Sequence, residues 1–266
     1  MIIARGKTRV GAWLDAISQI DPKNDGGRAY NVVVEVAQPS LATAESREAE
    51  RLVDSVLVAS GKQPLVTVAE TIFPMTEYRQ GGMKRVYEYP ETIYKNIAAE
   101  NPWGTYALRL VAERVDSDGE TYRPLEAMIN KMRRQLEGEG GKTAQRKRCF
   151  YELDVGMPAA ELKLYDPDDD AEATIRTQCL SHLSFKFGKT NSLYLTAMYR
   201  SQYFVEKALG NYRGLAALQA AVAHELKLEA GPLVVHATYA NYDAAAVGGP
   251  DDAKALIESA RKVLAG

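Results

Sequence analysis

The stretch that decides the fold is Arg176-Thr177-Gln178-Cys179-Leu180-Ser181-His182, followed about one hairpin later by Tyr199-Arg200-Ser201. Apolar and polar residues alternate on both sides of the turn Gly188-Lys189-Thr190-Asn191, which predicts a β-hairpin. The hairpin places Cys179 near the start of its first strand and Arg200 at the end of its second strand. We therefore expect a thiol beside a cation at one end of this strand pair.

Cys179 has two interpretations at this point. As a nucleophile it would be activated by Arg200, because nearby positive charge lowers the pKa of a thiol, and the guanidinium would also bind a phosphate. As a structural residue it would be buried in the core, where free cysteines are most often found. Strand alternation puts Cys179 on the face of Leu183 and Phe185, and His182 on the opposite face, so we do not expect His182 to be its general base.

The composition excludes several classes of protein. The 266 residues carry a net charge of −2, from 33 basic and 35 acidic side chains, which gives no reason to expect nucleic-acid or membrane binding. No apolar run approaches the roughly 20 residues that a membrane-spanning helix needs. Cys149 and Cys179 are too few for a disulfide framework, and no signal-peptide core is present, so a cytoplasmic protein is expected. The cysteines and histidines show no metal-ligand spacing, so no metal site is expected.

Hydrophobic periodicity divides the chain into helices and strands. Helices are predicted at residues 11–20, 42–59, 125–136, 212–226 and 251–264, and strands at 30–36, 149–155, 177–187, 192–199 and 233–238. Segments 65–73 and 105–115 fit either a helix or a strand, and segment 75–102 is expected to be irregular. No linker demands a boundary, so we expect a single domain over residues 1–266.

The order of Cys179, Arg200-Ser201 and Asn211, the last at the head of an apolar helix, resembles the thymidylate synthase family, including its nucleotide hydroxymethylase branch. Leu228-Glu229-Ala230-Gly231 is similar to the turn that follows this helix in the family. The resemblance implies an α/β (α+β) fold, in which a mixed, largely antiparallel sheet carries helices on one face. It also implies a homodimer in which the other face of the sheet packs against the partner.

Two upstream segments resemble family motifs that supply catalytic groups. Ala69-Glu70-Thr71-Ile72-Phe73 is similar to the segment whose Glu organises the catalytic water network, which implies proton transfer by Glu70. The alternative is a Glu at a helix end that faces water. Gly104-Thr105-Tyr106-Ala107-Leu108-Arg109 is similar to a second segment, which implies that Tyr106 holds or relays a proton from the substrate. Otherwise Tyr106 is a core aromatic residue.

The same resemblance implies a nucleotide site around Arg200-Ser201. The pair Arg146-Lys147 resembles the one that reaches across the dimer to the partner's nucleotide phosphate, with a solvated basic loop as the alternative. Arg28 is close enough to substitute for the expected arginine of the phosphate loop. Asn241 and Tyr239 fall near the positions that hold the sugar hydroxyl.

The implied reaction is one-carbon transfer to C5 of a pyrimidine 5′-monophosphate, with Cys179 adding covalently to C6 of the ring. The implied carbon donor is 5,10-methylenetetrahydrofolate, and the product is either the methyl or the hydroxymethyl nucleotide. Asn211 would present its amide to the edge of the base, or serve as the cap of its helix. Its amide favours dUMP or UMP, with CMP and dCMP as alternatives.

Two departures from the family pattern affect these expectations. Gln178-Cys179-Leu180 stands where the family has Pro-Cys-His, and Tyr203 stands where it has a folate-contacting Asp. A site left open to water near Tyr203 favours hydroxymethyl transfer, because water then traps the exocyclic methylene. The rival hypotheses are a nucleotide-binding homologue without folate turnover and an unrelated α/β enzyme in which Cys179 is structural.

Overall fold

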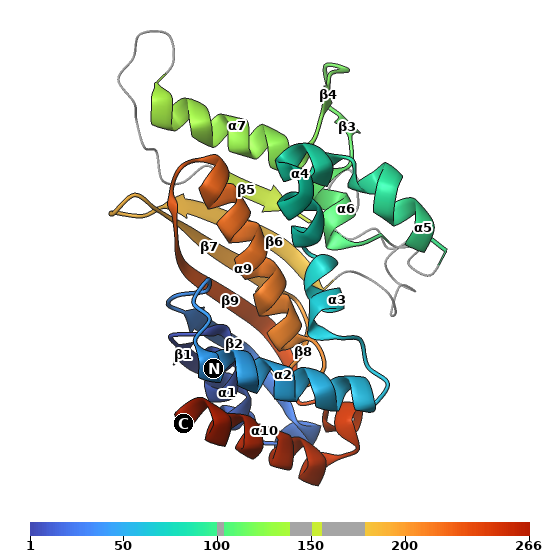
Figure 1. Ribbon diagram of the computed structural model, residues 1–266, viewed down its shortest axis with the longest axis vertical. Coiled ribbons are helices and arrows are strands. Elements are labelled where there is room, and N and C mark those ends of the chain that lie inside the picture. The colour runs from blue at the N-terminus through green and yellow to red at the C-terminus, as the bar shows by residue number, and fades with distance from the viewer. Residues whose placement is uncertain (100–103, 139–150, 156–178) are drawn as a thin grey trace.

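The computed structural model describes residues 1–99, 104–138, 151–155 and 179–266 (Figure 1). Within these ranges, seven strands form one sheet in the order β1-β2-β9-β7-β6-β5, and β8 pairs with β9 outside this path. Its strands are β1 (Ile2–Gly6), β2 (Arg28–Val36), β5 (Tyr151–Asp154), β6 (Leu180–Phe187), β7 (Ser192–Tyr199), β8 (Gln202–Tyr203) and β9 (Glu229–Asn241). A separate two-stranded sheet joins β3 (Arg114–Val115) to β4 (Thr121–Tyr122).

Helices cover one face of the large sheet, and α9 runs across it (Figure 1). The helices are α1 (Arg9–Gln19), α2 (Ala44–Ala59), α3 (Leu65–Glu70), α4 (Met75–Tyr87), α5 (Lys95–Ile97), α6 (Tyr106–Val111), α7 (Pro124–Glu137), α9 (Ala208–Glu225) and α10 (Pro250–Ala265), with a π-helical turn at Pro90–Tyr94 and 3-10 turns at Asn24–Gly26 and Ala244–Val247. Most side chains of α9 are buried, since it packs between the sheet and other helices.

The large sheet is mixed and largely antiparallel. β2 pairs antiparallel with β9 from Arg28 opposite Asn241 to Val36 opposite Leu233. β6 is antiparallel to both β5 and β7, whereas β1–β2, β7–β9 and β8–β9 are parallel. Buried residues alternate with exposed ones along β7 and most of β9, as expected for strands with one covered face. The predicted sheet, its helical cover and the central hairpin β6–β7 are confirmed.

Two glycines allow α3 to pack directly on α9. A Cβ atom on Gly210 would lie 2.7 Å from the side chain of Val68, and one on Gly214 would lie 2.7 Å from the carbonyl oxygen of Ala69. Because any larger residue would push the helices apart, this packing depends on glycine at both positions. Asn211 lies between these two glycines in the sequence of α9, so the close packing of the two helices also brings Asn211 near α3.

Several local predictions are resolved or corrected by the structure. Segments 65–73 and 105–115 both contain helices, α3 and α6. Segment 75–102 is wrongly predicted as irregular, since it contains α4, a π-helical turn and α5. The sequence of α4 carries only a weak helical signal, because Gly81 and Gly82 interrupt it. Both glycines have non-helical backbone angles in the structure, although Met83 and Val86 are buried. The short strand β1 has no predicted counterpart.

A bulge interrupts the alternation from which the face of Cys179 is predicted. β6 begins at Leu180, and its register with β7 shifts between Leu180 and His182, so that Leu180 and Leu183 are both buried. Such a bulge changes which residues face the core, so the face of Cys179 does not follow from that of Leu183. The ring nitrogen Nε2 of His182 lies 2.8 Å from the carboxylate of Glu152 on the more exposed side of the sheet.

Candidate active site

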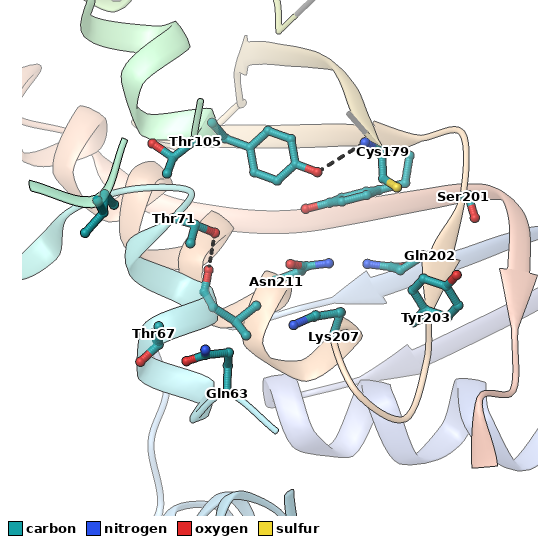
Figure 2. A pocket seen from close by; sticks show the side chains of 14 residues that line it. Gln63, Thr67, Thr71, Thr105, Cys179, Ser201, Gln202, Tyr203, Lys207 and Asn211 are labelled. Atoms are coloured by element: carbon teal, nitrogen blue, oxygen red, sulfur yellow. Dashed lines mark hydrogen bonds between the residues drawn. The ribbon is translucent and has the colours of Figure 1, made fainter. Parts of the chain in front are cut away.

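A cavity of about 530 Å³ lies where α3, α6, the β7–β8 turn and α9 meet, which is a typical size for a ligand site. We call it the thiol cavity. Its lining residues are Gln63, Thr67, Val68, Thr71, Ile97, Thr105, Tyr106, Cys179, Tyr199, Ser201, Gln202, Tyr203, Lys207 and Asn211. Figure 2 shows that the side-chain amides of Gln202 and Asn211 point toward each other, on the same side of the cavity as Lys207 and across from Cys179.

Cys179 precedes β6 and is held beside the end of β7. The backbone N–H of Arg200 donates to the carbonyl oxygen of Cys179 at 2.9 Å. Burial raises the pKa of the Cys179 thiol, and the positive charge of Arg200 lowers it by less. The predicted influence of Arg200 therefore has the expected sign, but burial outweighs it, and the thiol is mainly protonated at neutral pH.

Tyr106, the first residue of α6, fixes the backbone beside the thiol. Its hydroxyl oxygen accepts hydrogen bonds from the backbone N–H groups of Cys179 and Leu180, each at 3.2 Å. Burial raises the pKa of Tyr106, so its hydroxyl stays protonated at neutral pH. Because the oxygen accepts both hydrogen bonds, its own proton is available to a ligand in the thiol cavity.

Two buried amides give the thiol cavity its polar character. Gln202 is 2% exposed, and neither its amide nitrogen nor its amide oxygen has a hydrogen-bond partner among the described residues. Asn211 is 7% exposed, and Tyr199 contributes a buried hydroxyl that also lacks a partner in the described ranges. Each unsatisfied buried group costs about 1–3 kcal/mol, so a ligand or water that pairs with these groups is stabilised here. Donor and acceptor ends of two amides suit the edge of a planar heterocycle.

Cationic and hydroxyl groups gather near the end of β7. The hydroxyl of Thr238 on β9 donates to the carbonyl oxygen of Arg200 at 2.9 Å, which fixes the turn into β8. Ser201 and Lys207 line the thiol cavity, and the Lys207 ammonium lies 2.7 Å from the carboxylate of Glu206. Arg200 is exposed and is not part of the described cavity lining, although its charge acts on Cys179. The combination is suited to holding an anionic group of a ligand.

The structure does not bring Glu70 together with Cys179. On α3, Thr67 and Thr71 lie one turn apart and line the thiol cavity, whereas Glu70 lines a different cavity. Its carboxylate accepts hydrogen bonds from the backbone N–H of Thr76 at 3.2 Å and from the Thr76 hydroxyl at 3.0 Å. Burial raises the pKa of Glu70. Glu70 therefore caps the start of α4, and the helical period of α3 turns it away from the thiol.

The residues predicted for the sugar and the phosphate loop also lie apart from the thiol cavity. Arg28 and Asn241 are register partners on β2 and β9, and both line a shallow hollow of about 500 Å³. Tyr239 packs edge-on against Tyr30, with ring centroids 5.5 Å apart. The pair Arg146-Lys147 lies outside the described residues.

Several polar residues of the thiol cavity are absent from the sequence-based site, among them Gln202, Lys207, Thr67 and Thr71. A signal exists for Gln202, which directly follows Arg200-Ser201 and is a polar residue at the start of an apolar stretch. The i,i+4 spacing of the two threonines would have placed them on one face of α3, but only once that segment is known to be helical.

The described residues carry neither a metal-site signal nor a membrane-span signal. In the part of the chain that the structure describes, no group of three or more His, Cys, Asp or Glu side chains could hold a metal ion. None of the described helices combines the length and the apolar character needed to cross a membrane. The described lining of the thiol cavity contains no Asp or Glu.

The fold was compared with those of known proteins. No protein-family model matches the sequence, and no curated protein matches it. Among solved structures, the thermostable thymidylate synthase A from Bacillus subtilis is similar, with a TM-score of 0.51 over 94% of this chain and 84% of that chain. The two sequences are 13% identical, so the likeness concerns the arrangement of the backbone. The chain has a thymidylate synthase-like fold, as the resemblance of its spaced motifs predicts.

Proposed function

We propose that the protein transfers a one-carbon unit to C5 of a pyrimidine nucleoside 5′-monophosphate, by methylation or hydroxymethylation. The observation that carries this proposal is the placement of the Cys179 thiol in a cavity that also holds the buried amides of Gln202 and Asn211. A thiol can attack the pyrimidine ring as a nucleophile, and two amides can bind the polar edge of the base. The similarity in fold to a thymidylate synthase supports the same reaction class.

Cys179 would act as the covalent nucleophile. Its sulfur forms a bond to C6 of the ring while the thiol proton leaves to water, and the electron pair of the C5–C6 double bond shifts toward the ring carbonyl. C5 thereby gains the carbanion character that lets it bond to an electrophilic carbon. Loss of the C5 proton and cleavage of the sulfur–C6 bond then restore the C5–C6 double bond and release a thiolate, which takes a proton from water to become the thiol again. Tyr106 would hold a proton during these steps, and its hydroxyl beside the backbone of Cys179 supports this role.

Asn211 and Gln202 would orient the base and stabilise the charge that develops on its carbonyl oxygen. Either amide can present a donor to O4 and an acceptor to the N3 hydrogen of uracil, which favours UMP or dUMP. CMP and dCMP are the alternative substrates, since an amide can also turn to match cytosine. Ser201 and Lys207, which line the thiol cavity, would hold the phosphate together with Arg200, whose charge acts on Cys179.

The proposal includes a homodimer in which Arg146-Lys147 of one subunit reaches the nucleotide of the other. The uncovered face of the sheet carries exposed apolar side chains, including Ile3, Tyr194 and Met198, which suits it to a subunit interface. Arg28, Asn241 and Tyr239 would lie at the sugar and phosphate end of the site only after movement toward the thiol cavity, because they line or flank a separate hollow.

The carbon donor in the proposal is 5,10-methylenetetrahydrofolate, which supplies carbon at the oxidation level of formaldehyde. The described lining of the thiol cavity differs from the folate contacts of the family, because it includes no carboxylate and Tyr203 occupies the position of the folate-contacting Asp. The described lining therefore does not fit the folate contacts of the family.

A second function, nucleotide binding without turnover, is favoured by two observations. Glu70 caps α4 instead of lining the thiol cavity, and burial keeps the Cys179 thiol mainly protonated. A homologue with the nucleotide site but without an activated thiol would show both features. The two functions differ in whether the hydrogen at C5 is ever released.

Release of tritium tests the proposal directly. The protein is incubated with UMP, dUMP, CMP or dCMP, each tritiated at C5, together with 5,10-methylenetetrahydrofolate. We expect tritium release from one nucleotide, and the mass of the product separates the methyl from the hydroxymethyl nucleotide. Binding of a nucleotide with no tritium release from any of the four would establish the non-catalytic function instead.

A trapped adduct identifies the nucleophile. The 5-fluoro form of the preferred nucleotide cannot lose a proton from C5, so the covalent adduct should persist and add its mass to the peptide that contains Cys179. The Cys179→Ala variant should bind the nucleotide and form no adduct, while the Cys149→Ser variant serves as the matched control. Activity retained in Cys179→Ala would show that this cysteine is structural.

A further inference from the structure

A second cavity, of about 580 Å³, lies on the other side of α3 from the thiol cavity. Four exposed arginines from three helices line it: Arg47 and Arg51 of α2, Arg79 of α4 and Arg213 of α9. We call it the arginine cavity. The α3 residues that line it differ from those that line the thiol cavity, so α3 separates the two spaces. The arginine cavity has no role in the proposed one-carbon transfer.

The carboxylates of the arginine cavity are already engaged in local structure. Glu50 pairs with Arg9 at 2.9 Å, and both side chains are largely buried. Asp54 accepts a hydrogen bond from the backbone N–H of Leu65 at 2.6 Å, at the start of α3. Glu70 caps α4, and burial raises its pKa. Only Glu50 forms an ion pair within this described lining, and that pair is with Arg9. No carboxylate of the three is therefore in direct contact with the four exposed arginines, although the charge of Arg79 does act on Glu70.

The four arginines at the rim have few competing partners. Arg47 donates to a backbone carbonyl group, and Arg51 forms an exposed ion pair with Glu48 at 2.6 Å, of a kind that is worth about 0–1 kcal/mol. Arg79 and Arg213 make no direct hydrogen bond or ion pair with any residue in the described ranges, although the positive charge of Arg79 acts on Glu70 and opposes the rise in its pKa. The guanidinium groups on α4 and α9 are therefore available to an anion.

The floor of the arginine cavity is apolar and built largely from small side chains. Its apolar lining residues are Pro39, Ala42, Val66, Ala69, Phe73, Met75, Ala216, Ala217 and Ala220. Three of the alanines belong to α9 and leave a surface without long side chains. An apolar floor below a cationic rim suits a ligand with a flat or apolar body and a strongly anionic end.

We propose that the arginine cavity is a binding site for a nucleoside oligophosphate, separate from the thiol cavity. The base would lie on the alanine floor, and the phosphates would span Arg79 and Arg213. Guanidinium groups bind phosphate oxygens in pairs, and a chain of phosphates can engage arginines from more than one helix at once. A single isolated arginine would not distinguish such a ligand, but arginines on α2, α4 and α9 surround the same space.

Calorimetric titration of the full chain with ATP, tripolyphosphate and adenosine tests this site. We expect ATP to bind most tightly, tripolyphosphate more weakly because it lacks the base, and adenosine not at all. Arg79→Ser and Arg213→Ser should each weaken ATP binding by about tenfold or more, since each removes a charge-assisted hydrogen bond. Added salt should weaken ATP binding in the wild type.

Matched variants separate this site from general charge effects and from the thiol cavity. Arg5→Ser removes an exposed arginine on β1 and should leave ATP binding unchanged. Lys207→Ser removes a cation from the thiol cavity and should also leave it unchanged. The proposal is overturned if the wild type binds no ATP at millimolar concentration, if tripolyphosphate binds as tightly as ATP, or if Lys207→Ser weakens ATP binding as much as Arg213→Ser. Circular dichroism of each variant confirms that it is folded.

Discussion

The hydroxyl oxygen of Tyr106 accepts a hydrogen bond from the backbone N–H of Cys179 at 3.2 Å and thereby joins α6 to the start of β6. The same oxygen accepts a second hydrogen bond from Leu180 at 3.2 Å. These backbone groups precede the bulge in β6 and lie beside the thiol, so Tyr106 controls where the sulfur points. Substitution of Tyr106 should therefore lower the rate of reaction at Cys179 by more than its effect on the free energy of unfolding would suggest.

The variant Tyr106→Phe removes only the hydroxyl group. Two partly buried N–H groups then lose their acceptor, which should lower the free energy of unfolding by about 1–2 kcal/mol. Formation of the Cys179 adduct with the 5-fluoro nucleotide should slow by more than nucleotide affinity falls. Chemical denaturation and the time course of adduct formation measure the two effects. Tyr122→Phe, on the exposed ribbon β3–β4, is the control and should change neither. An unchanged adduct rate in Tyr106→Phe would contradict the positioning role.

The reactivity of Cys179 should depend on pH in a defined direction. Burial raises the pKa of this thiol above its ordinary value of about 8.5. The rate of alkylation by iodoacetamide should therefore keep increasing with pH and show no plateau near about pH 8.5. Mass spectrometry distinguishes alkylation of Cys179 from that of Cys149. Arg200→Leu should slow alkylation further at a given pH, and Arg200→Lys should restore part of the rate. A plateau below pH 8 would show that the thiol is activated.

The same shift sets the sign of a stability change. The folded protein disfavours the thiolate, so the folded pKa exceeds the unfolded one. The stability contributed by the neutral thiol is therefore fully present below about pH 8.5 and is lost as the pH rises through the folded pKa. Cys179→Ser should remove this dependence. Denaturation of both proteins at several alkaline pH values checks the prediction.

The role of Glu70 shows what a motif in the sequence can and cannot predict. The order of motifs leads to the correct fold, because spaced motifs along the chain follow the order of the strands and helices. It does not predict the rotation of α3, and that rotation turns Glu70 away from the thiol while Thr67 and Thr71 face it. Gln202 belongs to no periodic pattern that would predict its burial in the cavity. The bulge at Leu180 interrupts the strand alternation from which the face of Cys179 is predicted.

The variant Glu70→Gln distinguishes the catalytic role that the motif implies for Glu70 from the capping role that the structure shows. If Glu70 only caps α4, the variant should keep the rate of Cys179 adduct formation within about a factor of two. It should also change the free energy of unfolding by less than about 1 kcal/mol, because the amide is a weaker acceptor for the N–H of Thr76 while loss of the charge relieves the burial cost that raises the pKa of Glu70. Thr76→Ala should lose about 0.5–1.5 kcal/mol of stability, since it removes the hydroxyl hydrogen bond of the cap. Loss of adduct formation in Glu70→Gln alone would mean that Glu70 reaches the thiol cavity during the reaction.

Gln202 should strengthen nucleotide binding while lowering the stability of the ligand-free protein. Its amide is buried without a partner among the described residues, so Gln202→Leu should leave the free energy of unfolding unchanged or raise it by up to about 1–3 kcal/mol. The same change should weaken nucleotide binding by about tenfold, because the base loses an amide partner. Denaturation and calorimetry measure the two effects. Gln63→Leu, at the other end of the thiol cavity, is the control and should weaken binding less. Reduced stability of Gln202→Leu would show that water already satisfies the amide.

Gly214→Ala should separate α3 from α9. Alanine at an ordinary interior position of a helix stabilises a protein by about 0.5–1 kcal/mol relative to glycine. Here the new Cβ would lie 2.7 Å from the carbonyl oxygen of Ala69 and 2.9 Å from Cβ of Ile72, neither of which is a flexible side-chain end. Relief of this overlap moves one helix, and overpacking of this kind costs about 1–3 kcal/mol. Since Thr67 and Asn211 line the thiol cavity from these two helices, thermal stability and nucleotide affinity should fall together. A rise in melting temperature would show that the two helices separate without cost.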